Sequence, residues 1–145
     1  MLYLAGDRHG LEAVKMVEDY LKAHAIQCEN LGVKREGEDL PLEEIIPRVA
    51  RSVFEHEGNS GILICGTGIG VAIGANRFAG IRACLATDEQ IAEWSKIYDN
   101  CNVLCLAGWG AKKEGIWKIL DAWFRAKYDG DAERSKTFRI FDTWH

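Results

Sequence analysis

The chain has 145 residues, of which 48% are hydrophobic and 28% are charged, and its formal net charge is −4. This composition is that of one globular domain with a substantial core, and the negative charge gives no reason to expect nucleic acid or a membrane as a partner. The N-terminus turns polar too early for a signal peptide, and no apolar run approaches the roughly 18 residues of a membrane span. Five cysteines without a CxxC pair or a histidine cluster predict free thiols in the cytoplasm, with neither a disulfide framework nor a metal site.

The first half of the chain alternates short apolar segments with longer amphipathic ones. Residues 1–5 predict a strand, and apolar residues at helical spacing predict a helix over 11–21. The same alternation predicts a second strand at 26–31, a helix over 42–53 and a third strand at 61–65. Several strand segments are apolar at consecutive positions, which is typical of parallel strands covered on both faces.

The second half continues this alternation. A fourth strand is predicted at 81–86, followed by a helix that begins at Thr87 or Asp88, either of which could cap it. A fifth strand is predicted at 102–106, and the longest helix from about 112 to 128. We therefore predict a single α/β domain over the whole chain, with a Rossmann-like doubly wound sheet of about five parallel strands and helices on both faces.

A cysteine, Cys65, stands at the end of the third predicted strand, and a glycine-rich turn leads from it into a helix. Glycines let backbone N–H groups approach a ligand closely, and a helix N-terminus offers unpaired donors, so the turn could hold a phosphate or an oxyanion. The same donors favour a thiolate, which could serve as a base near neutral pH. The alternative is a tight connection with a buried cysteine, whereas the spacing fits neither common nucleotide-binding motif. The turn reads Gly66, Thr67, Gly68, Ile69, Gly70.

The segment 61–82, with ICGTGIG followed by AGIR, resembles the ribose-5-phosphate isomerase B family, which includes the galactose-6-phosphate isomerase subunits. The similarity extends over nearly the whole chain. It implies aldose–ketose isomerisation of a sugar phosphate through a cis-enediolate, without a metal or cofactor. It further implies a homodimer or a dimer of dimers with shared active sites, proton transfer by Cys65, and binding of the enediolate by residues 66–70, including Thr67.

The segment after the first predicted strand reads DRHG at residues 7–10, where the family carries Asp-His-x-Gly. The histidine is displaced by one residue, as in one galactose-6-phosphate isomerase subunit. A histidine at a strand end suits proton transfer near neutral pH, so we predict that Asp7 and His9 open the cyclic sugar. His9 could instead be an ordinary loop residue. Arg8 is a candidate phosphate ligand.

Two later segments also depart from the family pattern. Tyr98 and Asp99 stand where the family has a His-Asn pair, and Trp109 stands where it has an arginine. The resemblance brings these segments to the substrate from the partner subunit, so Tyr98 and Asp99 are predicted to contact the sugar. The alternative for Tyr98 is a helix-face residue in the core or at an interface. Trp109 could line a pocket or fill an interface.

The tail 129–145 is polar and then aromatic, and we predict that it packs on the partner subunit. Its cations Arg134 and Arg139 are candidate phosphate ligands, although a charged tail can also be a solvated face. The predicted reaction converts ribose 5-phosphate to ribulose 5-phosphate, or acts on a related pentose or hexose phosphate. The alternative is a non-catalytic or half-site subunit of a heteromeric isomerase, against which the presence of Cys65 argues.

Overall fold

The computed structural model describes residues 1–144, which form a five-stranded sheet with the strand order β2-β1-β3-β5-β4. All the pairings between neighbouring strands are parallel. The chain passes from β1 outward to β2 and then returns to β3 on the other side of β1, so the strand order reverses between β1 and β3. The predicted parallel α/β sheet is thereby confirmed. Its strands are β1 Leu2–Gly6, β2 Cys28–Asn30, β3 Ser60–Cys65, β4 Ala83–Leu85 and β5 Val103–Ala107.

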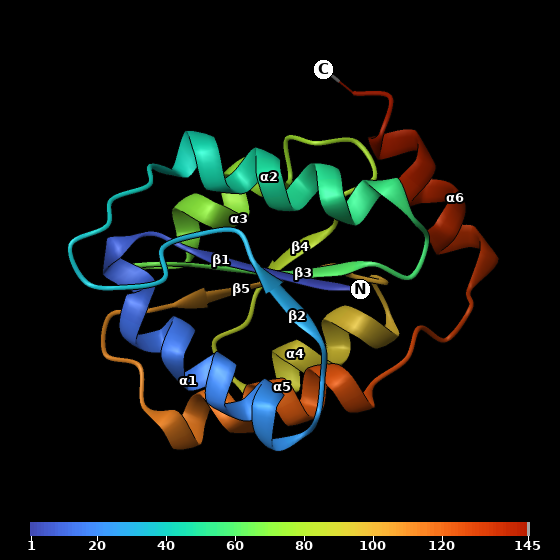
Figure 1. The fold of residues 1–145 in the computed structure, drawn as a ribbon. Coiled ribbons are helices and arrows are strands. Elements are labelled where there is room, and N and C mark those ends of the chain that lie inside the picture. The colour runs from blue at the N-terminus through green and yellow to red at the C-terminus, as the bar shows by residue number, and fades with distance from the viewer. Residues whose placement is uncertain (145) are drawn as a thin grey trace.

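Helices cover both faces of the sheet (Figure 1). One face is covered by α1 (Leu11–Ala23), α4 (Glu89–Ile97) and α5 (Lys113–Arg125), and the other by α2 (Leu42–Glu55) and α3 (Ile69–Ala75). A short 3-10 helix, η1 (Arg8–Gly10), connects β1 to α1, and α6 (Ala132–Phe141) follows α5. In Figure 1, α6 lies at the end of the molecule where β1 begins.

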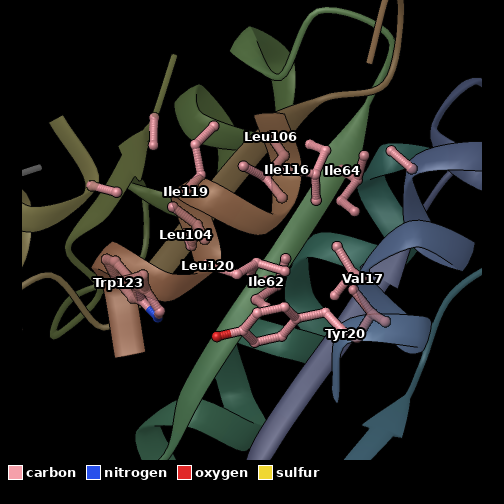
Figure 2. Close-up of a cluster of buried hydrophobic side chains, with 14 of the residues drawn as sticks. Val17, Tyr20, Ile62, Ile64, Leu104, Leu106, Ile116, Ile119, Leu120 and Trp123 are labelled. Atoms are coloured by element: carbon pink, nitrogen blue, oxygen red, sulfur yellow. The ribbon is translucent and has the colours of Figure 1, made fainter. Parts of the chain in front are cut away.

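The alternation of side chains along β3 divides its apolar residues between two cores. Ile62 and Ile64 face α1 and α5, whereas Leu63 and Cys65 face α2 and α3. Figure 2 shows the first core, where side chains of α1 and α5 meet those of the central strands. The hydroxyl of Tyr20 in this core donates a hydrogen bond of 2.7 Å to Asp121. Burial, with this bond to a carboxylate, raises the pKa of Tyr20 far above its usual value.

The largest departure from the predicted elements lies after the fifth strand. The helix predicted to reach residue 128 ends at Arg125, because Ala126 adopts an extended conformation with ψ of 148°. The tail forms α6, which the sequence did not predict and which buries none of its residues. Asp131 caps it by accepting a hydrogen bond of 2.8 Å from the amide of Arg134.

The tail contacts its own chain. Asp142 accepts a hydrogen bond of 2.7 Å from the amide of Gly80, and the Arg82 guanidinium lies 5.7 Å from the ring centre of Phe138. These contacts hold α6 against the loop between α3 and β4. No helix in residues 1–144 has the length and apolar character needed to cross a membrane.

Candidate active site

The carboxyl ends of β1, β3 and β5 meet at the edge of the sheet where the strand order reverses, which is where doubly wound sheets bind ligands. Main-chain hydrogen bonds join the three segments. The amide of Asp7 donates to the carbonyl of Ile64 at 3.2 Å, and the amide of Gly108 donates to the carbonyl of Cys65 at 2.7 Å. The amide of Trp109 donates to the carbonyl of Gly66 at 2.9 Å. The predicted segments 7–10 and 65–70 therefore lie side by side, with the loop after β5 against them.

Cys65 ends β3 with only 5% of its surface exposed, and its Sγ accepts a hydrogen bond of 3.2 Å from the amide of Gly68. Gly68 has a φ of +73°, and a Cβ there would lie 2.5 Å from a methyl carbon of Leu85. Only glycine fits this conformation and this space, so the turn can aim its N–H at the sulfur. The thiol is therefore in direct contact with the glycine-rich turn.

The other cysteines have different surroundings. Burial is the main cause that raises the pKa of Cys28 to about 11 and the pKa of Cys101 to about 12. Burial also raises the pKa values of Cys84 and Cys105. These four thiols therefore stay protonated near neutral pH, and none of them follows a strand at the reversal point.

Thr67 and Ile69 complete the turn. The hydroxyl oxygen of Thr67 accepts a hydrogen bond of 3.1 Å from the amide of Ile69, which leaves the hydroxyl hydrogen free to donate to a ligand. A Cβ on Gly70 would lie 3.0 Å from Leu42 and 4.0 Å from the sulfur of Cys65, so this residue directly adjoins the thiol. The turn thus presents a hydroxyl and main-chain donors beside the sulfur.

Asp7 and His9 follow β1 at the same edge. Oδ1 of Asp7 accepts hydrogen bonds from the amides of His9 at 2.9 Å and Gly10 at 3.0 Å, and so caps η1. Nε2 of His9 accepts a hydrogen bond of 3.4 Å from Nε of Arg8, and Nη1 of the same guanidinium lies 3.9 Å from Asp39. The imidazole meets the ring of Trp109 edge to face, with the ring centres 5.5 Å apart. Capping is a role of Asp7 that the sequence analysis missed.

A second cluster, away from Cys65, consists of Tyr98, Asp99 and Arg134. Tyr98 is 46% exposed, so it is no core residue, and the guanidinium of Arg134 lies 5.5 Å from its ring centre. Arg134 pairs with Asp129 and lies 3.9 Å from Asp131. This pairing holds the pKa of Asp129 below its usual value and raises the pKa of Arg134. Arg139 lies exposed in the last turn of α6.

This second cluster lies at the amino ends of β4 and β5. Asn100 accepts a hydrogen bond of 2.8 Å from Arg82, which directly precedes β4, and Tyr98 lies shortly before the start of β5. Cys65 instead pairs with Ala107 at the other end of β5, which is about 13 Å away along a five-residue strand. The two clusters therefore do not meet within one chain. A groove of about 1080 Å³ adjoins the second cluster, and Asp99 contributes to its wall.

Residues 2–140 match the sequence pattern of the family described as Ribose/Galactose Isomerase. The chain belongs to this family. The resemblance noted in the sequence is thereby confirmed, as is the prediction of a sugar-phosphate isomerase of this type. In residues 1–144, no three His, Cys, Asp or Glu side chains are grouped as metal ligands would be.

Individual family members match the chain over nine-tenths or more of their lengths. A probable ribose-5-phosphate isomerase B of Mycoplasma pneumoniae is 32% identical over 141 residues, which cover 96% of this chain and 91% of the relative. The crystal structure of a ribose 5-phosphate isomerase from Thermotoga maritima has a TM-score of 0.91 at 31% identity, and the match covers 99% of this chain and 97% of that one. The Mycoplasma genitalium isomerase B, solved with bound ribulose-5-phosphate, has a TM-score of 0.80 at 29% identity and is matched over 97% of this chain and 93% of that one.

The isomerase fold also positions Gly108, which the sequence analysis did not single out. A Cβ on Gly108 would lie 2.6 Å from the carbonyl oxygen of His9 and 3.1 Å from that of Cys65. The loops after β1, β3 and β5 can approach this closely only because the residue has no side chain. A glycine two residues after the predicted strand 102–106 was the available signal for this close approach.

Proposed function

We propose that the chain isomerises an aldose phosphate to its ketose, with ribose 5-phosphate or a related pentose or hexose phosphate as substrate and Cys65 as the acid and base. The observation that carries this proposal is the buried sulfur at the end of β3, which accepts a hydrogen bond of 3.2 Å from the amide of Gly68. The isomerase of Mycoplasma genitalium was solved with ribulose-5-phosphate, which supports this substrate class.

The proposed cycle begins with the cyclic sugar. His9 and the second carboxylate oxygen of Asp7, which is not used in capping, transfer protons at the ring oxygen and the anomeric hydroxyl. The Cys65 thiolate then removes the proton from C2 of the open aldehyde and returns it to C1. Between these steps, the enediolate is stabilised by the hydroxyl of Thr67 and by the amides of residues 66–70, of which those of Gly68 and Ile69 would first have to leave Cys65 and Thr67. By comparison with other oxyanion holes, each well-placed donor contributes about 3 kcal/mol.

We also propose that two copies of the chain share each site. Within one chain, Arg134 and Tyr98 lie at the opposite edge of the sheet from Cys65. A twofold dimer can bring the amino-end cluster of one copy to the thiol of the other. The phosphate would then meet Arg134, whose planar guanidinium suits two parallel hydrogen bonds to phosphate oxygens.

The direct test is an isomerase assay of the purified chain alone. We expect ketose to form from ribose 5-phosphate without added metal, and a panel of four-, five- and six-carbon aldose phosphates would rank the substrates by kcat/KM. If no member of the panel reacted while the chain still bound sugar phosphates, the chain would be the half-site subunit of a heteromeric isomerase.

Replacing Arg134 by alanine should raise KM for phosphorylated sugars by about 10- to 100-fold, with a smaller change in kcat. The reason is that a charge-assisted hydrogen bond to phosphate contributes roughly 1.5–3 kcal/mol. Steady-state kinetics would measure this, with Arg125→Ala as a matched control, because Arg125 is an exposed arginine on α5. If KM were unchanged in both Arg134→Ala and Arg139→Ala, the phosphate would have to be bound by Arg8 and the lysines after β5.

Mixing two impaired variants should restore activity if the site is shared, when the substrate is kept well below the raised KM of Arg134→Ala. Cys65→Ala lacks the base and Arg134→Ala lacks the phosphate ligand, but a mixed dimer has one site in which both residues are intact. We therefore expect activity to appear when the two purified variants are mixed and allowed to exchange subunits. The control is Cys65→Ala mixed with Thr67→Val. Cys65 and Thr67 come from the same copy in each shared site, so every site of this mixed dimer lacks one of the two residues. Full activity of a chain that light scattering shows to be a monomer would contradict a shared site.

A further inference from the structure

Trp109 is a large aromatic residue that is 62% exposed and yet held firmly at the proposed site. Its amide donates to the carbonyl of Gly66 at 2.9 Å. The preceding amide, that of Gly108, donates to the main-chain carbonyl of Cys65 at 2.7 Å. A Cβ on Gly66 would lie 2.5 to 2.8 Å from three atoms of the indole. The indole therefore lies directly against the main chain of the turn, which admits it only because residue 66 is glycine.

Among residues 1–144, the exposed indole has one aromatic neighbour, the imidazole of His9. The two ring centres are 5.5 Å apart and the ring planes are 77° apart, so the rings meet edge to face, an arrangement that aromatic pairs favour. Asp7 fixes the main chain of His9, but it does not fix the imidazole. The one side-chain hydrogen bond of the imidazole among the described residues is a long one of 3.4 Å from Arg8, which is itself largely exposed.

We propose that Trp109 is a positioning residue for ring opening, which holds the imidazole of His9 against the turn that carries Cys65. This inference rests on the proposed isomerase function. It assigns to Trp109 an effect on one step only, because the proton transfers by Cys65 begin after the sugar has opened. A general acid or base must lie within hydrogen-bonding reach of its proton, and misplacement by about 1 Å can cost about 100-fold in rate.

Two substrates separate this step from the rest of the cycle. Ribose 5-phosphate closes to a furanose through its free hydroxyl at C4. Erythrose 4-phosphate carries its phosphate at C4 and cannot close in this way. We expect Trp109→Leu to lower kcat/KM for ribose 5-phosphate by about tenfold or more and to change the value for erythrose 4-phosphate by less than about twofold. Trp109→Phe should restore most of the loss, because phenylalanine keeps an aromatic face for the imidazole.

The double variant His9→Asn with Trp109→Leu provides the decisive comparison. If Trp109 acts through His9, the double variant should be no slower on ribose 5-phosphate than His9→Asn alone. Losses that multiply would overturn the proposal, as would equal losses on both substrates, which would indicate that the indole contacts the sugar itself. Dissociation of Trp109→Leu into monomers by light scattering, with an unchanged ratio between the two substrates, would likewise overturn it in favour of an interface role.

A second measurement keeps the test valid if erythrose 4-phosphate reacts too slowly. Ribulose 5-phosphate is an open chain, so uptake of solvent deuterium at its C1, followed by NMR, reports enediolate formation without ring opening. Trp109→Leu should leave this uptake nearly unchanged while it slows the isomerisation of ribose 5-phosphate. Equal slowing of both would overturn the positioning role. Absence of both reactions in the unmodified protein would instead overturn the proposed function.

Discussion

Replacing Cys65 by alanine should lower kcat by about 10²- to 10⁴-fold, which is the usual contribution of a general acid–base group. The variant has no other group at the end of β3 that could take the proton from C2. Its fold should persist, because a methyl group replaces a small buried side chain at the margin of the second core. Coupled detection of the ketose would measure the loss, and the melting temperature would verify the fold.

The control for this variant is Cys28→Ala, which removes a half-buried thiol from β2 at the edge of the sheet. We expect it to retain nearly full activity. Cys65→Ser should resemble Cys65→Ala, because a hydroxyl keeps the shape of the thiol but ionises far less readily. If Cys65→Ala kept more than about a tenth of the activity, a different base would have to act at this site.

Replacing Trp123 by alanine should lower the free energy of unfolding by about 3–5 kcal/mol, as is typical for truncation of a buried aromatic residue. Trp123 on α5 is 1% exposed and lies in the core shown in Figure 2. Its ring also lies 4.3 Å from Nζ of Lys96, and burial lowers the pKa of that ammonium group. The substitution would therefore leave a cavity and would remove the aromatic partner of a partly buried cation.

Denaturation by urea would measure this loss, with an unchanged m-value as the sign that the unfolded state is the same. Trp144→Ala is a control of the same residue type, because Trp144 is 67% exposed, and it should cost less than about 1 kcal/mol. A loss of similar size in both variants would show that the core around α5 is no more important to stability than the tail.

The central strands and their order along the chain were predictable because they are apolar on consecutive positions. Each of the short strands β2 and β4 pairs with one neighbour only, and each proved shorter than its apolar segment. The helix α6 was not predicted, because it buries no residue and so carries no apolar stripe that a periodicity could reveal. Its one local signal was the capping residue Asp131.

The site was predictable as far as strand ends determine it. Cys65, Asp7 and His9 each stand at the carboxyl end of a predicted parallel strand, where a doubly wound sheet binds its ligand. The contact between Trp109 and His9 could not be predicted, since it depends on how two side chains from separate loops are oriented. The pairing of Arg134 with Asp129 depends likewise on how the chain turns between α5 and α6, which residue types alone do not determine.

The main-chain hydrogen bonds that join the ends of β1, β3 and β5 have a consequence for how such enzymes diverge. An amide and a carbonyl are present at almost every residue, so these bonds survive a change of side chain at Arg8 or Trp109. A substitution at Arg8 or Trp109 therefore leaves the sulfur of Cys65 and its turn in place. These two side chains can therefore diverge between related enzymes without displacing the main chain of the site, provided that the glycines at 66, 68 and 108 remain.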